Sequence, residues 1–184
     1  MIWTIHGCKP HHVDVFLFGA GAVIRSVLRG AQVIVVDIDQ NKLDIARSIG
    51  ATHVLNARDT NFTEQLKQLS NGHGPNVTIE AAGNSQTYRT VINEVAFSGR
   101  VVFIGYAGKE IAFQTHLFVQ KELDIRGSRN AEWSDFKAVI NYLRKTDDCD
   151  ELISKVILPQ EFPTAIKEWL LNSGSVMKLM VQFK

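Results

Sequence analysis

The sequence predicts an α/β fold, in which a doubly wound, mostly parallel six-stranded sheet is covered by helices on both faces. Short apolar runs alternate with segments of helical period along most of the chain. The apolar runs are continuous instead of alternating with polar residues, which is typical of strands buried on both faces. The expected strands cover residues 14–18, 32–37, 53–56, 76–81, 100–105 and 123–127.

Helices are expected between these strands. In the segment 40–49 the apolar residues share one face, Asp39 can cap the N-terminus and Gly50 can end the helix. Segments 62–69, 85–96 and 133–143 have the same apolar spacing. We expect the last two to pack on the sheet.

The pattern changes near the end of the chain. A strand at 153–158, a helix at 162–171 and a strand at 178–183 predict a small βαβ unit. We therefore expect two domains, residues 1–150 and residues 151–184.

Composition excludes several classes of function. The chain has 184 residues, 45% of them hydrophobic and 21% charged, with a formal net charge of +1. This balance favours neither nucleic acid nor a membrane as a partner, and we expect a cytoplasmic protein. Its two cysteines predict no disulfide framework. Cys8, His11 and His12 lack a fourth metal ligand nearby, so we predict no metal site. The other histidines have no carboxylate or nucleophile at a spacing that suggests catalysis, so we predict no catalytic residue.

A dinucleotide-binding motif follows the first expected strand. Gly19, Ala20 and Gly21 form a Gly-x-Gly turn, which lets a pyrophosphate approach the backbone at a helix N-terminus. Asp37 ends the second strand, where an acid can accept the ribose hydroxyls. The third glycine of the motif is replaced by Ile24. A purely structural Gly-x-Gly turn is the alternative interpretation.

Several segments in order resemble the medium-chain, zinc-type alcohol and polyol dehydrogenases, specifically the cofactor-binding C-terminal half of such enzymes. The resemblance is carried by the runs at 32–51, 79–84, 99–105 and 121–130, and by Phe162-Pro163 and Lys178-Leu179. It implies a Rossmann-type dinucleotide-binding domain over 1–150, with 1–12 as a remnant of the helix that leads into it. Residues 151–184 would be a C-terminal remnant of the catalytic domain.

The resemblance also implies NAD as the cofactor and a set of binding residues. Gly19, Ala20 and Gly21 match the pyrophosphate turn, Asp37 the adenosine-ribose acceptor and Lys42 the basic residue beside it. The carboxylate of Asp37 would repel the 2′-phosphate of NADP. Further matches border the cofactor or its nicotinamide end, namely Ala82, Gly83, Gly105, Tyr106, Ser128 and Arg129.

The same resemblance shows departures from the family. The segments that supply zinc ligands in full-length relatives are not matched, so we expect no dehydrogenase activity from this chain alone. A small alcohol or polyol would be a substrate only with a catalytic half supplied. The helix at 22–29 is about five residues shorter than in relatives, and its apolar face must come from Val23, Ile24, Val27 and Leu28. We expect weakened cofactor binding.

Two hypotheses remain open. The chain is either part of an NAD-dependent zinc-type alcohol, polyol or sugar-acid dehydrogenase, or a non-catalytic nucleotide-binding or interaction module. By family analogy, a homo-oligomer could form through the edge near 123–126. The pattern does not favour the short-chain dehydrogenases, because they need Lys four residues after a Tyr, and the three tyrosines are followed at that distance by Ile92, Glu110 and Thr146.

Overall fold

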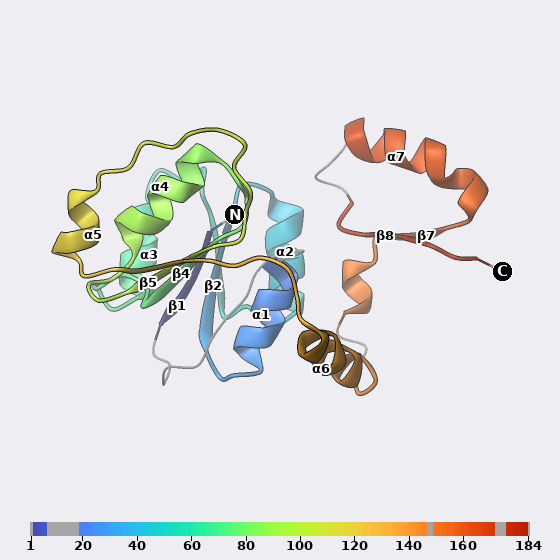
Figure 1. Ribbon diagram of the computed structural model, residues 1–184, viewed down its shortest axis with the longest axis horizontal. Coiled ribbons are helices and arrows are strands. Elements are labelled where there is room, and N and C mark those ends of the chain that lie inside the picture. Colours follow the sequence, from blue (N-terminus) through green and yellow to red (C-terminus); the bar gives the residue numbers. More distant parts are fainter. Residues whose placement is uncertain (1, 7–18, 147–148, 172–175, 184) are drawn as a thin grey trace. The chain divides into compact units, whose positions relative to one another are not determined.

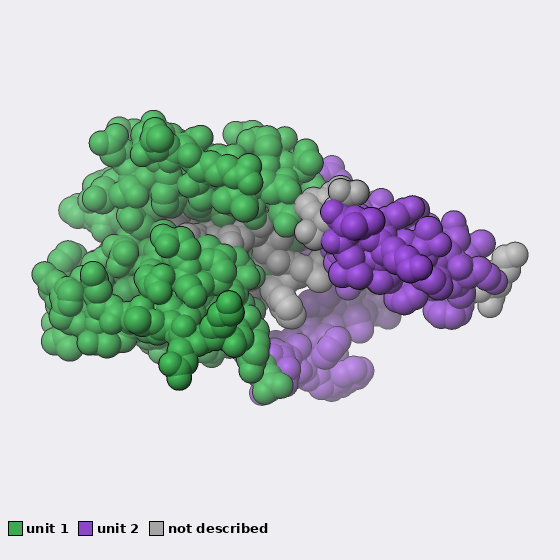
Figure 2. Space-filling view, turned by 90° about the horizontal axis from the view of Figure 1, so that it is seen from above, with its two compact units in different colours: residues 1–129 green, residues 130–184 purple. Residues whose placement is uncertain are grey.

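The computed structural model describes residues 2–6, 19–146, 149–171 and 176–183. Contacts divide the chain into two compact units, residues 1–129 and residues 130–184, which Figure 2 colours separately. The predicted division after residue 150 concerns the domains of longer relatives, and it stays a prediction.

The first unit is built from alternating strands and helices (Figure 1). Its strands are β1 (Ile2–His6), β2 (Gln32–Asp37), β3 (His53–Asn56), β4 (Val77–Glu80), β5 (Arg100–Phe103) and β6 (Asp124–Gly127). Its helices are α1 (Gly19–Val27), α2 (Gln40–Ser48), α3 (Phe62–Leu69), α4 (Ser85–Glu94) and α5 (His116–Gln120). The predicted α/β class, with parallel strands alternating with helices, is confirmed.

The strands of this unit form one six-stranded sheet in the order β3-β2-β1-β4-β5-β6. Neighbouring strands are parallel, except that β1 is antiparallel to both β2 and β4. Strands β2 to β6 therefore all point the same way. Their carboxyl ends meet at one edge of the sheet, which is where open α/β sheets bind ligands.

The N-terminal segment differs from the prediction. Ile2–His6 is a strand, with Ile2 opposite Val36 on one side and opposite Glu80 on the other. We expected a helix remnant over 1–12, but Ile, Trp and Thr are β-branched or aromatic residues that favour strands. The predicted first strand, 14–18, lies outside the described residues.

Strand β2 is buried on both faces. Ile34 and Val36 belong to an apolar cluster with residues of α3 and α4. Val33 and Val35, whose side chains alternate to the other face, are also buried. Figure 1 shows α1 and α2 beside this part of the sheet, and both helices contact β2. Helices thus cover both faces, as the continuous apolar run predicts.

Most predicted elements are found near their expected bounds. The bounds of β2, β3, α3 and α6 (Trp133–Leu143) agree with the predicted ranges. Strand β5 and helix α4 end two residues earlier than predicted, β4 is one residue shorter at each end, and β6 begins one residue later. Helix α5 was not predicted, since its five residues are too few to show a helical period.

The second unit contains α6, a 3-10 turn (η1, Asp150–Leu152), β7 (Lys155–Ile157), a second 3-10 turn (η2, Pro159–Glu161), α7 (Phe162–Leu171) and β8 (Leu179–Val181). Strands β7 and β8 are parallel, and Lys155 lies opposite Leu179. Ile157 of β7 and Ala165 of α7 are the buried apolar residues among the described residues of this unit. The predicted βαβ pattern is confirmed. The expected packing of α6 on the large sheet stays a prediction.

Within the described ranges, no helix combines the length and the apolar character needed to cross a membrane.

Candidate functional site

Helix α1 begins at the first glycine of the dinucleotide-binding motif. We predicted a turn at Gly19, Ala20 and Gly21 and a helix from residue 22, but all three residues lie in the first turn of α1. Such small residues fit a helix as readily as a turn, so sequence alone does not separate the two. The first N–H groups of a helix have no partner within it. The backbone of Gly19, Ala20 and Gly21 therefore offers donors at a helix N-terminus.

The surroundings of α1 show how its shortened sequence is accommodated. Gly21 is exposed, and a Cβ atom built on it would meet nothing within 4 Å. Val23 and Ile24 are buried as predicted, whereas Val27 and Leu28 are 36% and 54% exposed. The buried face is completed by smaller residues instead, which include Ala20, Ala22 and Ser26. Val27 and Leu28 are the residues at the end of α1, and Val27 lies against Gly50.

Asp37 lies at the carboxyl end of β2, where it is 7% exposed. Its Oδ1 atom accepts a hydrogen bond from the backbone N–H of Asp39 at 2.9 Å. Asp39 in turn caps α2 through its own Oδ1, which accepts from the N–H groups of Asn41 and Lys42 at 2.9 and 3.4 Å. Asp37 and Asp39 thus both accept backbone hydrogen bonds at the junction between β2 and α2.

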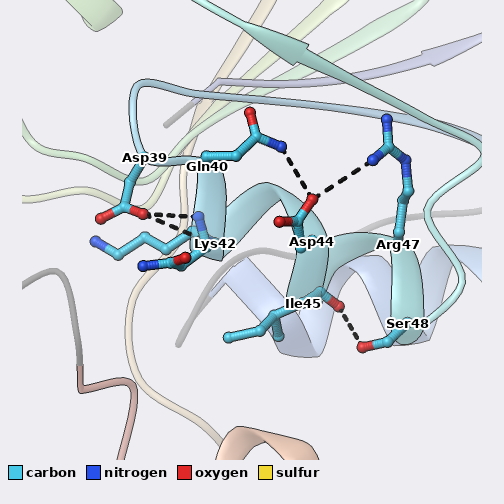
Figure 3. A network of polar contacts seen from close by, with 8 residues as sticks. Asp39, Gln40, Lys42, Asp44, Ile45, Arg47 and Ser48 are labelled. Carbon is cyan, nitrogen blue, oxygen red and sulfur yellow. Dashed lines mark hydrogen bonds and ion pairs between the residues drawn. The ribbon is translucent and has the colours of Figure 1, made fainter.

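Lys42 lies in the first turn of α2, beside the capping carboxylate of Asp39 (Figure 3). Its side chain is half-buried, and among the described residues its ammonium group has no hydrogen-bond or ion-pair partner. The structure therefore brings Asp37 and Lys42 to the same junction, with the cation of Lys42 available to a ligand.

Ala82, Gly83, Gly105 and Tyr106 come together from the loops that follow β4 and β5. The N–H groups of Ile104 and Gly105 both donate to the carbonyl oxygen of Glu80, at 2.8 and 2.9 Å. Gly83 has a φ of 70°, and a Cβ atom there would lie 2.6 Å from the carbonyl oxygen of Tyr106. A Cβ on Gly105 would likewise collide with the Glu80 carboxyl group and the Gly83 nitrogen. Only glycine fits at these two positions.

The sequence analysis missed Glu80, whose side chain is fully buried beneath these loops. Its Oε1 atom accepts hydrogen bonds from the N–H groups of Ala82 and Gly83, each at 2.9 Å, and from the Thr87 hydroxyl at 2.5 Å. A signal was present, because an acid at the end of a buried apolar strand and just before a small-residue loop needs partners.

Tyr88 supports the second loop from α4. Its hydroxyl donates to the carbonyl oxygen of Gly105 at 2.5 Å. Its ring stacks on Phe103 with centroids 4.3 Å apart. Burial, followed by the negative charge of Glu80, raises the pKa of Tyr88, so the hydroxyl keeps its proton for this hydrogen bond.

Ser128 and Arg129 follow β6 and are exposed. The N–H of Ser128 donates to the carbonyl oxygen of Phe103 at 2.9 Å, which extends the pairing of β5 and β6. These two residues, Asp37 and the loops after β4 and β5 all follow carboxyl ends of parallel strands. Helix α1 contacts β2 and joins its start through a short turn, so the N-terminus of α1 points toward the same edge. The predicted residues thus lie along one edge of the sheet.

No group of three or more His, Cys, Asp or Glu side chains that could hold a metal ion occurs in the part of the chain that the structure describes. Cys8, His11 and His12 lie outside that part. The N–H groups at the start of α1 suit an anion, and the acid Asp37 lies at the same edge of the sheet. These features fit a dinucleotide.

The chain is similar in sequence to known dehydrogenases. A family profile described as "Zinc-binding dehydrogenase" matches residues 19–145. The chain is 27% identical over 175 residues to an uncharacterised zinc-type alcohol dehydrogenase-like protein of Haemophilus influenzae, covering 92% of this chain and 51% of the relative. It is 35% identical over 133 residues to the D-xylulose reductase of Scheffersomyces stipitis, covering 68% and 36%.

A similar fold occurs among solved structures. An Escherichia coli CFT073 protein, described as a short-chain alcohol dehydrogenase in complex with the cofactor NADH, superposes with a TM-score of 0.80 at 24% identity. The superposition covers 90% of this chain and 49% of that chain. The chain therefore spans about half of the length of such proteins, and 51% or less of the two curated relatives.

Proposed function

The chain belongs to the zinc-binding dehydrogenase family, and we propose that it binds NAD(H) as the cofactor half of an NAD-dependent zinc-type alcohol, polyol or sugar-acid dehydrogenase. The observation that carries the proposal is the position of Asp37. This acid is buried at the carboxyl end of β2, on the edge toward which the N-terminus of α1 points, within the segment that the family profile matches. A cytoplasmic location is part of the proposal.

Each residue on this edge has a role in the proposal. The N–H groups of Gly19, Ala20 and Gly21 bind the pyrophosphate, which the positive end of the helix dipole stabilises. Asp37 accepts hydrogen bonds from the adenosine ribose and disfavours the 2′-phosphate of NADP. The ammonium group of Lys42 lies beside the same ribose.

The remaining residues border the nicotinamide end. Ala82 and Gly83 present backbone from one loop, and Gly105 and Tyr106 present backbone from the next. Ser128 and Arg129 follow the neighbouring strand. The assignment of these residues to the cofactor site is supported by their position, because all of them follow carboxyl ends of parallel strands, where this fold class usually binds ligands.

The bound cofactor would supply the hydride chemistry, and in full-length relatives a zinc ion polarises the substrate oxygen. Among the described residues none is assigned a catalytic role, and none forms a metal site. Because the sequence does not match the segments that supply zinc ligands in full-length relatives, we propose that the chain is inactive alone, and that an alcohol or polyol is a substrate only when a zinc-binding half is supplied.

A titration with NADH tests the proposal. Wild-type protein should enhance and shift NADH fluorescence, and Asp37→Ala should weaken binding by about tenfold or more. Asp44→Ala is the matched control, because Asp44 is an exposed acid in the same segment, and its side-chain partners within the described part of the chain are Gln40 and Arg47 (Figure 3). NADPH should bind more weakly than NADH to the wild-type protein.

The second candidate is a non-catalytic nucleotide-binding or interaction module. Two observations favour it, namely Ile24 in place of the third glycine and the antiparallel strand β1 at the centre of an otherwise parallel sheet. Absence of NADH binding at millimolar concentration would support this module. Self-association through the exposed edge strand β6 is its expected mode of interaction, and analytical ultracentrifugation would detect it.

A further inference from the structure

A buried carboxyl group lies under the two loops that the proposed function places against the cofactor. Glu80 has no exposed surface, although an ionisable side chain is rarely buried without partners. Its two oxygens differ. Oε1 accepts three hydrogen bonds, whereas Oε2 is buried and has no hydrogen-bond partner among the described residues. Burying the unpaired Oε2 atom costs free energy, and the three hydrogen bonds to Oε1 offset part of the cost of burying the carboxyl group.

The three bonds determine the conformation of the first loop. The N–H groups of Ala82 and Gly83 are adjacent in sequence, yet both point at the same oxygen atom. This requires a sharp turn of the chain, in which Gly83 adopts its positive φ of 70°. The Thr87 hydroxyl holds the same oxygen from the first turn of α4, and Asn84 caps that helix. The loop is therefore tied to the sheet and to α4 together.

The second loop is shaped around the same carboxyl group. Gly105 lies so close to Oε2 that a methyl group there would collide with it. The Gly105 N–H donates to the Glu80 carbonyl oxygen at 2.9 Å, and Tyr88 holds the Gly105 carbonyl from α4. Glu80 thus contacts both loops, and a shift of its side chain would move both.

We propose that Glu80 is a positioning residue, which sets the Ala82–Gly83 backbone and the adjoining Gly105 at the separation that the cofactor requires. Glu80 acts through these loops, because no part of it reaches the surface. The inference rests on the proposed NAD(H) binding and extends it to a residue outside the cofactor-contacting set.

The test combines amide hydrogen exchange, measured by NMR without cofactor, with NADH titration. In Glu80→Ala, the exchange rates of the Ala82 and Gly83 amides should rise by about tenfold relative to wild type, while amides of β2 keep their protection. The dissociation constant for NADH should rise by about tenfold. In Glu80→Gln, which keeps one oxygen acceptor in the same shape, both effects should be smaller than about threefold.

Substitutions of Thr87 provide a milder pair in case Glu80→Ala does not fold. Thr87→Val removes the third donor and should raise the same two exchange rates, while Thr87→Ser, which keeps the hydroxyl, should restore them. Thr90→Val is the matched control, because the Thr90 hydroxyl lies on the same helix and, among the described residues, bonds to Gln86 and not to Glu80. It should change neither exchange nor affinity.

The outcomes separate the inference from the proposed function. Unchanged exchange at Ala82 and Gly83 in folded Glu80→Ala or Thr87→Val, or equal increases throughout the sheet, would overturn the positioning role. Faster loop exchange with an unchanged NADH affinity would also overturn it, while the proposed function would stand. If the wild-type protein binds no NADH, the proposed function fails, and the exchange data still decide whether Glu80 holds the loops.

Discussion

Gly83 and Tyr106 meet backbone to backbone, although they belong to loops after different strands. A Cβ atom on Gly83 would lie 2.6 Å from the Tyr106 carbonyl oxygen and 3.0 Å from its carbonyl carbon. Gly83 also has a φ of 70°, which disfavours any residue with a Cβ atom. Conformation and contact therefore both select glycine at this position.

Gly83→Ala should destabilise the protein by about 2–4 kcal/mol, because the left-handed conformation and the collision with fixed backbone add together. Gly72→Ala separates the two causes, since Gly72 has a φ of 82° but open space around its Cα atom. It should cost about 1–2 kcal/mol. Urea unfolding measures both, and equal losses would show that the Tyr106 contact is unimportant.

Lys121 closes the C-terminal end of α4. Its Nζ atom donates to the carbonyl oxygens of Asn93 and Val95 at 2.7 and 2.8 Å. Helix C-termini leave such carbonyls without intrahelical partners. Lys121→Met should therefore lower the free energy of unfolding by about 1–2 kcal/mol. Lys109→Met, at an exposed lysine, should change it by less than about 0.5 kcal/mol, and a similar loss in both variants would contradict the capping role.

Glu94 should make stability depend on pH. Burial raises the pKa of Glu94, against the opposing effects of Lys67, Thr63 and Lys121. The protonated form is therefore favoured by folding, and this stabilisation is complete below the ordinary pKa and is lost as pH rises through the raised value. Relative to Glu94→Gln, wild-type protein should gain stability as pH falls from neutral to about 4. Thermal unfolding at several pH values would show it, and a difference independent of pH would contradict it.

Asp124 should have the opposite dependence. Hydrogen bonds from Arg126 and then Arg100 lower the pKa of Asp124 to about 2. Its contribution is present above the ordinary value of 3.8 and is lost as pH falls through the lowered value. Asp124→Asn should lower the melting temperature at neutral pH, and the difference from wild type should shrink under acid conditions. Because the group is solvent-accessible, high salt should also shrink it. A difference that salt and acid leave unchanged would contradict this ion-pair origin.

Gly21→Ala should separate stability from cofactor binding. The position is helical and has open space, so alanine should leave stability unchanged or raise it by up to about 1 kcal/mol. The added methyl group would nevertheless keep a pyrophosphate from the backbone, and NADH affinity should fall by about tenfold. Isothermal titration calorimetry measures the affinity. An unchanged value would mean that the first turn of α1 does not bind the pyrophosphate.

Much of the fold is predictable from local sequence patterns. The run at 33–36 is apolar throughout and lies between the polar residues Gln32 and Asp37, so both ends of β2 are predicted correctly. Asp39 and Gly50 likewise bracket α2, as a capping side chain and a residue of positive φ. Such signals act within a few residues and need no knowledge of the tertiary structure.

The candidate site is less predictable, because its geometry depends on segments that are distant in sequence. The sequence shows that residues 83 and 105 are small, flexible glycines, but it does not predict that the two loops contact each other. Glu80 is readable as an acid at a strand end, but its three donors come from a loop and a helix. The sequence also does not predict that α1 begins at Gly19, because Gly and Ala suit either a turn or a helix.

Local sequence patterns are enough to predict the α/β alternation, the family and the residues expected at the ligand edge, because hydrophobic period, caps and motif spacing are local properties of the chain. The packed structure is needed to learn that Ile2–His6 occupies the centre of the sheet, that Gly19 lies inside a helix, and that one buried carboxyl group contacts two loops. These outcomes depend on which surfaces exclude water together and which buried donors find acceptors, and both are properties of the packed chain.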